Sequence, residues 1–219
     1  MKNLVIFGTG PFAEIARYHV ERDSDYTVVA FTVDAAYRTG NTFQGLPLIP
    51  FEEISAACPP SQCEMFVAMG IQKVNQHRAA KAAAAEAKGY TVASFLSPKA
   101  KVAPDLVLRP NTFVMEEAFI QPFVEIGRDT IIWPRTTIGF KSRIGEHCWI
   151  VAATLGEAVV VGDYTFIGVN ATIAPCFTIG ARNVIGAGAL ILQNTRESEV
   201  YKGCASVASR VPSHRLRRI

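Results

Sequence analysis

The sequence of 219 residues lacks the cysteine patterns of disulfide frameworks and zinc sites: its five cysteines are scattered, with no CxxC or CxxH spacing. It has no charged-then-apolar leader, and no apolar run approaches the roughly eighteen residues of a membrane span. Its formal net charge of +3 is too small to indicate a nucleic-acid partner. These absences predict a cytoplasmic protein with no metal, no membrane span and no nucleic acid as partner.

What the sequence has instead is an apolar residue at every sixth position between 102 and 191. A period of six is neither helical nor the alternation of an ordinary strand, and it predicts a left-handed parallel β-helix of hexapeptide repeats. A β-sandwich with coincidental spacing is the alternative. One interval between Ile150 and Val161 is shortened by one residue. The repeated residues are Val102, Leu108, Val114, Ile120, Ile126, Ile132, Ile138, Ile144, Ile150, Val161, Ile167, Ile173, Ile179, Ile185 and Ile191.

The N-terminal half opens with a strand over 2–7, a glycine-rich turn, a helix, and a second strand over 26–32 that leads to Asp34. This order predicts a Rossmann-like parallel α/β sheet. Glycines in such a turn let backbone amides approach an anion, and the helix N-terminus adds partial positive charge. Asp34 is placed to accept hydrogen bonds from a ribose. The expected substrate-binding residues of the turn are Gly8, Thr9, Gly10, Pro11 and Phe12.

The turn lacks the third glycine of the dinucleotide pattern, since Ala13 or Glu14 stands near its place. This weakens an NAD interpretation and favours the phosphate of a nucleotide or a sugar nucleotide. The remaining alternative is a parallel α/β domain that serves only folding or packing.

Further strands and helices alternate up to residue 98. Strands are expected over 46–49, 65–69 and 90–96, and helices over 51–57 and 72–88. Lys73, in a polar loop after a strand, is a candidate phosphate contact. His77 and Arg78 are expected on the solvated face of their helix, and His19 has no visible partner. The predicted domains are 1–98, a Rossmann-like nucleotide-sugar-binding domain; 99–200, the β-helix; and 201–219, a basic tail.

The motifs GTGPFAEIARY, AFTVD, LPLIPFEEI, MFVAMG and IGVNATIAPCFTIGARNVIGAGALIL resemble the bacterial sugar O-acyltransferase family typified by sialic acid O-acetyltransferase. Bacillosamine-type sugar N-acetyltransferases are relatives. The resemblance implies a homotrimer that binds acetyl-CoA, or another acyl-CoA, along the groove between solenoids. It also implies a nucleotide sugar in the N-terminal domain. The residues expected around the CoA are Gly168, Asn170, Ala171, Gly186 and Ala187.

The chemistry of the family needs a general base, for which histidine is suited. The resemblance predicts histidines where this chain has Phe140-Lys141 and Ala152-Ala153, and near Glu157 in the bacillosamine-type branch, but none of these positions holds one. His147, expected to face outward near a corner, and Glu157 are the candidate substitute bases. Two functions follow: a CoA-dependent sugar acyltransferase with a rearranged base, or a catalytically impaired trimeric scaffold that binds a ligand or partner.

Overall fold

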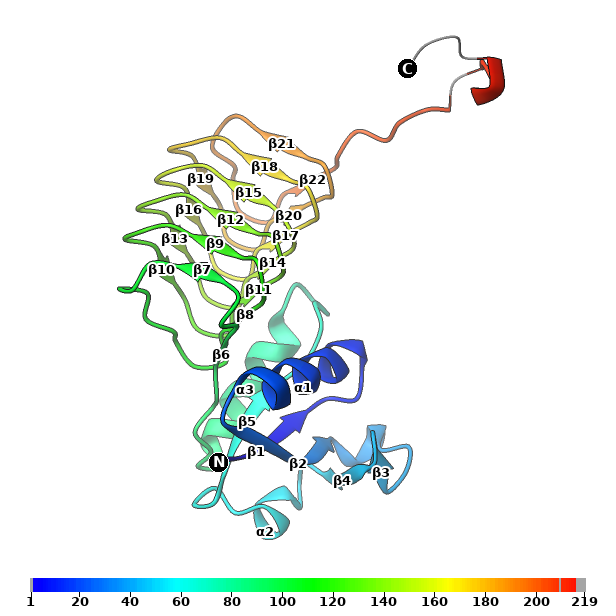
Figure 1. Ribbon diagram of the computed structural model, residues 1–219, viewed down its shortest axis with the longest axis vertical. Coiled ribbons are helices and arrows are strands. Elements are labelled where there is room, and N and C mark those ends of the chain that lie inside the picture. The colour runs from blue at the N-terminus through cyan, green and yellow to red at the C-terminus, as the bar shows by residue number, and fades with distance from the viewer. Residues whose placement is uncertain (1, 209, 216–219) are drawn as a thin grey trace.

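The computed structural model describes residues 2–208 and 210–215 of the chain. Figure 1 shows a sheet-and-helix region at the N-terminal end and a tall solenoid that continues from it. Residues 204–208 leave the solenoid and run outward. Of the predicted tail 201–219, positions 209 and 216–219 lie outside the described residues.

The N-terminal region is built on an open sheet of strand order β3-β4-β2-β1-β5, in which all neighbours except β3 and β4 are parallel. Its strands are β1 (Lys2–Phe7), β2 (Tyr26–Val33), β3 (Thr42–Phe43), β4 (Leu46–Pro50) and β5 (Cys63–Val67). Its helices are α1 (Pro11–Asp23), α2 (Ile54–Ala57), α3 (Gln76–Ala87) and the 3₁₀ turn η1 (Ala35–Tyr37). The helix expected over 72–88 begins late, because residues 73–75 adopt left-handed backbone angles.

The predicted solenoid is confirmed as stacks of two-residue parallel strands, consistent with a left-handed β-helix of hexapeptide repeats. We call the first of its three sheets the covered sheet, because the N-terminal region packs against it. The covered sheet contains β6 (Phe95–Leu96), β8 (Phe113–Val114), β11 (Ile131–Ile132), β14 (Trp149–Ile150), β17 (Phe166–Ile167), β20 (Val184–Ile185) and β22 (Val200–Tyr201). The second sheet contains β7 (Lys101–Val102), β9 (Phe119–Ile120), β12 (Thr137–Ile138), β15 (Thr154–Leu155), β18 (Thr172–Ile173) and β21 (Leu190–Ile191). The third sheet contains β10 (Glu125–Ile126), β13 (Arg143–Ile144), β16 (Val160–Val161) and β19 (Thr178–Ile179). A 3₁₀ turn, η2 (Ser213–Arg215), lies in the tail.

Inside the prism, the second residue of nearly every strand is buried and packs against its equivalents in the coils above and below. This stacking explains the period of six, since each strand places one branched side chain inward. Leu108 departs from the pattern, because no strand is assigned between β7 and β8, although its side chain still packs partly against the core. The shortened interval falls at the turn 151–153, after β14.

Two sequence expectations at the junction are corrected. The strand expected over 90–96 is split: Val92 forms a single bridge with Met65, whereas Phe95–Leu96 pairs with β8 and begins the covered sheet. At the other end, Val200–Tyr201 pairs with β20 and so continues the same sheet.

The N-terminal region and the covered sheet share one apolar core. Phe12 of α1 makes an edge-on contact with Trp149, at 4.9 Å between ring centroids, and another with Phe113, at 5.8 Å. Such aromatic pairs stabilise beyond the area they bury. The outward side chains of the covered sheet are therefore held against α1 and the end of the N-terminal sheet.

Candidate active site between the sheet edge and the solenoid

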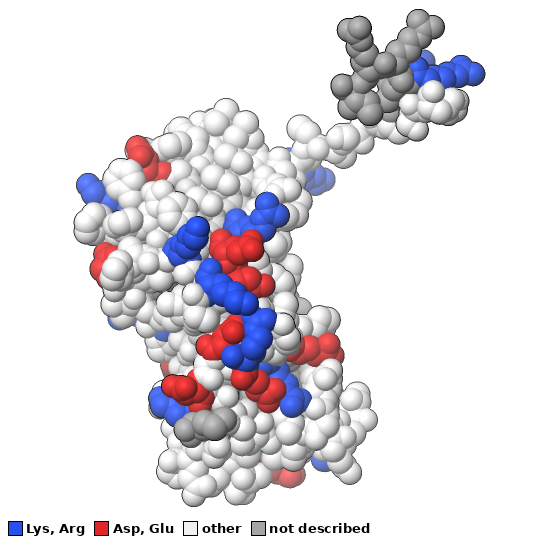
Figure 2. Space-filling view, in the orientation of Figure 1, with Lys and Arg blue, Asp and Glu red and all other residues white. Residues whose placement is uncertain are grey.

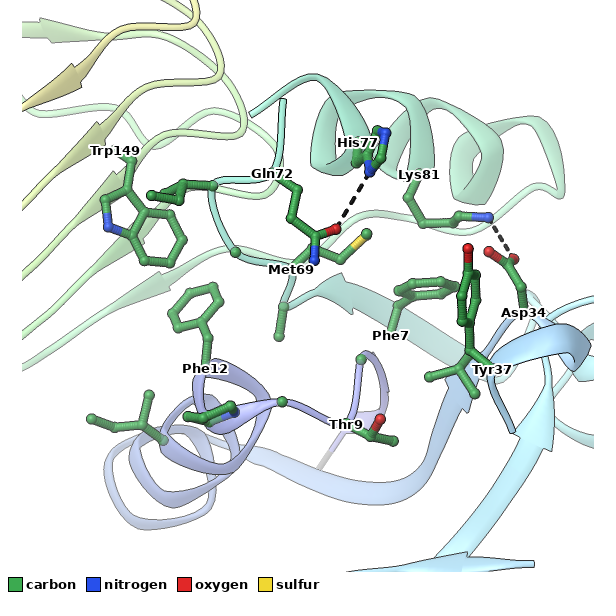
Figure 3. A pocket seen from close by; sticks show the side chains of 18 of the residues that line it. Phe7, Thr9, Phe12, Asp34, Tyr37, Met69, Gln72, His77, Lys81 and Trp149 are labelled. Atoms are coloured by element: carbon green, nitrogen blue, oxygen red, sulfur yellow. Dashed lines mark hydrogen bonds and ion pairs between the residues drawn. The ribbon is translucent and has the colours of Figure 1, made fainter. Parts of the chain in front are cut away.

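A cavity of about 1030 Å³ opens where the carboxyl ends of the parallel strands meet the covered sheet. Ligands of open α/β sheets bind at this edge. Figure 3 shows α1 and its preceding loop on one side of the cavity, α3 on the other, and Trp149 of the solenoid at one end. The lining residues are Phe7, Gly8, Thr9, Gly10, Pro11, Phe12, Ile15, Val33, Asp34, Tyr37, Ala68, Met69, Gly70, Ile71, Gln72, His77, Ala80, Lys81, Trp133 and Trp149.

The two glycines of the first loop play different structural parts. Gly8 has φ +125°, and a Cβ atom there would lie 2.6 Å from the carbonyl oxygen of Ala68, so only glycine fits. Gly10 is the N-cap of α1, has no side-chain cap, and would place a Cβ atom in open space. The structure thus brings Gly8, Thr9, Gly10, Pro11 and Phe12 together along the cavity wall.

At the far end of the cavity, Asp34 is bound by Lys81 of α3, with 2.6 Å between Nζ and Oδ1 (Figure 3). The ammonium group of Lys81 also lies over the rings of Phe7 and Phe51, at 5.0 and 4.7 Å from their centroids. Tyr37 lines the same end and is largely exposed. Lys73, proposed from the sequence as a phosphate contact, is exposed and is not among the described lining residues.

The solenoid end of the cavity is aromatic and carries one unsatisfied donor. Phe12, Trp133 and Trp149 form its walls, and the indole Nε1 of Trp133 is buried without a hydrogen-bond partner among the described residues. Trp133 begins one of the turns that follow strands of the covered sheet. We call this stack of turns the cavity corner, residues 133–135, 151–153, 168–170 and 186–188.

The residues predicted to bind CoA lie along the cavity corner, in coils above Trp133. Asn170 has φ +58° at the turn, and its amide donates to the carbonyl of Ala152 in the coil below. Gly168 and Gly186 occupy equivalent places one coil apart, and Ala187 is exposed beside Gly186. Ala171 differs, because it is buried and belongs to the solenoid core.

His147 lies on another corner, in a stack of side chains that we call the ladder: Asn111, Asp129, His147, Tyr164 and Arg182, each with left-handed φ. Its Nδ1 atom is 2.8 Å from Oδ2 of Asp129, and its ring stacks on Tyr164 at 4.6 Å. The side chain of His147 is only 12% exposed, so the expected outward position is corrected. It lines a smaller groove of about 530 Å³ beside α3 and does not belong to the described lining of the large cavity.

Arg78 is the second correction, because it is completely buried and does not face solvent. Its guanidinium contacts Asp129, 2.9 Å from Nε to Oδ1, and donates to the backbone carbonyls of Asp129, His147 and Cys148. Burial lowers the pKa of Arg78 from its ordinary value, and Asp129 opposes this shift. Asn111 completes the cluster, because its amide bonds both Asp129 and the backbone of Val67 at the end of β5.

His19 also has a partner, contrary to expectation. It is buried where α1 meets the solenoid, with Nε2 3.3 Å from Oε2 of Glu116. Burial lowers the pKa of His19, and this effect outweighs the opposing attraction of Glu116.

Sequence reasoning missed several lining residues, above all His77, Tyr37, Trp133 and Trp149. His77 is exposed, as expected, yet it lies in the first turn of α3 and lines the cavity. Its position soon after Gly70, at the end of a strand segment, is the signal that could have indicated it. Glu157 is exposed on a turn between the second and third sheets and does not appear in the described cavity lining.

The cavity therefore combines the uncapped N-terminus of α1, the ion pair of Asp34 and Lys81 at one end, and an aromatic wall with the unpartnered indole nitrogen of Trp133 at the other. No cluster of three or more metal-ligating side chains occurs in residues 2–208 and 210–215. None of the helices described in these residues has the length and hydropathy to cross a membrane.

Residues 158–193 match the bacterial transferase hexapeptide family (six repeats). A mutant of perosamine N-acetyltransferase from Caulobacter crescentus, solved with CoA and GDP-perosamine, is similar in structure with a TM-score of 0.82. It is 25% identical, and the match covers 93% of this chain and 94% of that one. The acetyltransferase domain of PglB from Neisseria gonorrhoeae shares the fold, with a TM-score of 0.80 at 21% identity, over 93% and 97% of the two chains.

Two curated relatives each match less than half of this chain. The bifunctional protein GlmU of Baumannia cicadellinicola is 29% identical over 118 residues, 45% of this chain and 24% of that protein. A 2,3,4,5-tetrahydropyridine-2,6-dicarboxylate N-succinyltransferase of Xylella fastidiosa is 26% identical over 122 residues, 49% of this chain and 44% of that enzyme. The chain thus spans less than half the length of these two relatives.

Proposed function

We propose that this protein transfers an acyl group from acyl-CoA, acetyl-CoA in the first instance, to a nucleotide-linked sugar. The observation that supports the proposal is the shared cavity, because the glycine-containing loop of the N-terminal α/β region and the solenoid wall line one space. The nucleotide would lie at the end with Asp34 and Tyr37, its diphosphate beside Gly8 and Gly10. The sugar would then reach the aromatic end.

The cavity corner supports a CoA site next to the sugar. Trp133 ends the cavity, and Asn170, Gly186 and Ala187 continue the same corner in the coils above. A thioester placed along this corner would meet an acceptor that projects from the cavity. The similar enzyme from Caulobacter crescentus was solved with CoA and GDP-perosamine, which fits a two-substrate site of this kind.

Transfer joins the acceptor oxygen or nitrogen to the acyl carbon, breaks the thioester bond, and needs a group to take the acceptor proton. We assign Glu157 as the first candidate base and His147 as the second. Glu157 is exposed on a corner that a neighbouring copy could present to the cavity, whereas the imidazole of His147 faces the groove behind α3. A homotrimer would supply that neighbour.

The second sheet offers a surface for such an assembly. Its outward row holds Thr137, Thr154 and Thr172, flanked by the exposed apolar side chains of Phe119 and Leu190. A flat, regular row of this kind suits a closed threefold contact. Light scattering at micromolar concentration should give three times the mass of one chain, and a monomer mass would contradict the assembly.

The deciding experiment measures thiol release from acetyl-CoA over a panel of UDP- and GDP-linked amino and neutral sugars. Release that depends on one acceptor, with the acylated sugar nucleotide found by mass spectrometry, is the expected result. The rival function is a scaffold with impaired catalysis, favoured by Phe140 and Lys141 where the resemblance predicts histidines. Binding of CoA and a sugar nucleotide without transfer of the acyl group would establish the scaffold function.

A further inference from the structure

The ion pair at one end of the cavity uses only one oxygen of its carboxylate. Asp34 follows β2 directly, and its backbone carbonyl accepts a hydrogen bond from the amide of Tyr37 at 2.8 Å. Lys81 binds Oδ1 of Asp34 at 2.6 Å (Figure 3), whereas Oδ2 accepts no hydrogen bond from the described residues. The side chain of Asp34 is 30% exposed and lines the cavity. One carboxylate oxygen is thus held by the protein, and the other is left for a ligand.

The ammonium group of Lys81 is itself held in place by aromatic rings. It lies 5.0 Å from the ring centroid of Phe7 and 4.7 Å from that of Phe51, and these two buried rings meet edge to face at 5.3 Å. Attraction between a cation and ring faces favours this position of the ammonium group. The helix that carries Lys81 is fixed in turn, because Arg78, three residues earlier on α3, is buried against Asp129 of the solenoid.

A carboxylate after the second strand of an open α/β sheet can recognise the ribose of a nucleotide. In such folds this acid accepts a hydrogen bond from the ribose 2′-hydroxyl. An unpaired carboxylate would also repel the diphosphate of the same ligand. The ion pair with Lys81 offsets this repulsion and restricts the rotation of the carboxylate. The free oxygen of Asp34 therefore loses less conformational entropy when it accepts a hydroxyl group.

We propose that Lys81 is a positioning residue, which fixes the carboxylate of Asp34 so that Oδ2 accepts the ribose 2′-hydroxyl. The site thereby prefers ribonucleotide sugars to their 2′-deoxyribose counterparts. The inference rests on the proposed function, because it takes a nucleotide-linked sugar as the ligand of the cavity. The adjacent backbone does not replace the carboxylate, since the amide of Ala35 already donates to Oε2 of Glu52 at 3.1 Å.

Calorimetric titrations with UDP-glucose and GDP-mannose, each compared with its 2′-deoxyribose counterpart, measure this preference directly. The two ligands of a pair differ in one hydroxyl group, so the contributions of the base, the diphosphate and the sugar cancel in the ratio of their Kd values. A hydrogen bond to a charged group contributes roughly tenfold or more in affinity. We expect the wild type to bind the ribonucleotide sugar about tenfold more tightly than its 2′-deoxy counterpart.

Three variants separate positioning from simple attraction of charge. Lys81→Met frees the carboxylate of Asp34, so the preference should fall from about tenfold to about twofold or less. The lost positive charge should weaken both ligands of a pair equally, and this part cancels in the ratio. Lys81→Arg, which can keep the ion pair, should retain most of the preference. Lys88→Met is the matched control and should keep the wild-type ratio. The ammonium group of Lys88 also lies over the ring of Phe51, at 4.9 Å, but Lys88 is not in the described cavity lining.

Asp34→Ala tests the same inference from the other side of the ion pair. It removes the acceptor itself, so the preference should be lost to the same extent as in Lys81→Met. A preference of about tenfold that survives in either variant would overturn the inference, and so would a wild type that binds both ligands of a pair equally. In each of these cases the nucleotide site would stand. Failure of all four ligands to bind the wild type would overturn the proposed nucleotide site and this inference with it.

Discussion

Oδ2 of Asp129 lies 2.8 Å from Nδ1 of His147, one coil further along the same corner of the solenoid, while Oδ1 of Asp129 holds the buried Arg78. One carboxylate thus connects the ladder to helix α3. Because Arg78 and Asp129 are fully buried, their charges are compensated mainly by each other and by backbone carbonyls. The attachment of α3, and with it one wall of the cavity, depends on this pair.

Asp129→Ala should be strongly destabilising, because it leaves the Arg78 guanidinium buried without its counter-charge. Breaking such a pair costs about 3–5 kcal/mol. Urea denaturation followed by circular dichroism measures the loss of unfolding free energy. Arg182→Met is the matched control on the same ladder: its side chain is half exposed, and we expect a change of about 0.5 kcal/mol or less. A loss below about 1 kcal/mol for Asp129→Ala would contradict this account.

Gly10→Val should block the nucleotide sugar while leaving the fold intact. A side chain at this position enters open space at the head of α1, where a phosphate would lie. Thermal melting should show little change, and calorimetry should show no binding of a nucleotide sugar that the wild type binds. Unchanged binding would remove the loop from the site.

Gly8→Ala should behave in the opposite way and destabilise the protein by about 1–3 kcal/mol. Its backbone has φ +125°, and the new methyl group would lie 2.6 Å from the carbonyl oxygen of Ala68. Chemical denaturation of Gly8→Ala and Gly10→Val, side by side, separates the structural glycine from the ligand-facing one. Equal stabilities would refute the distinction.

Stability should decrease as the pH falls below about 6.5, in part because of His19. Burial lowers the pKa of His19 in the folded protein beneath its ordinary value of 6.5, so the unfolded chain binds the proton more tightly. The contribution of neutral His19 to the free energy of unfolding is complete above about pH 6.5. It is lost as the pH falls toward the pKa of His19 in the folded protein, by at most about 1.4 kcal/mol per pH unit. His19→Phe should flatten this slope between about pH 5 and 7. Parallel slopes in urea denaturation would show that His19 does not cause the effect.

Removing the true general base should lower turnover about 100- to 10,000-fold, with little change in acetyl-CoA binding. We expect this loss for Glu157→Gln in a thiol-release assay, and a smaller loss for His147→Ala. If both variants turn over sugar nucleotides like the wild type, neither residue is the base. The proton acceptor would then be another group, supplied by the substrate or by a neighbouring copy.

The local periodicity of the sequence was sufficient to predict much of the fold. A branched residue at every sixth position can be buried only if successive strands turn a corner and stack, so Val114, Ile132 and Ile150 are aligned by their spacing of eighteen residues alone. In the same way, β1, the glycine-containing turn and α1 are contiguous in the chain, and short-range geometry determines them. The loop that lines the cavity was therefore identifiable from the sequence.

The tertiary structure decided which partner each side chain of a helix packs against. Arg78 and His77 are adjacent on α3, and the helical pattern alone left both on the solvated face. Yet Arg78 is buried against Asp129, fifty-one residues away along the chain, while His77 lines the cavity. The aromatic wall likewise joins Phe12 to Trp149 across most of the chain. Periodicity indicates which side chains of a segment are buried. The segment that they pack against is determined only when distant parts of the chain come together.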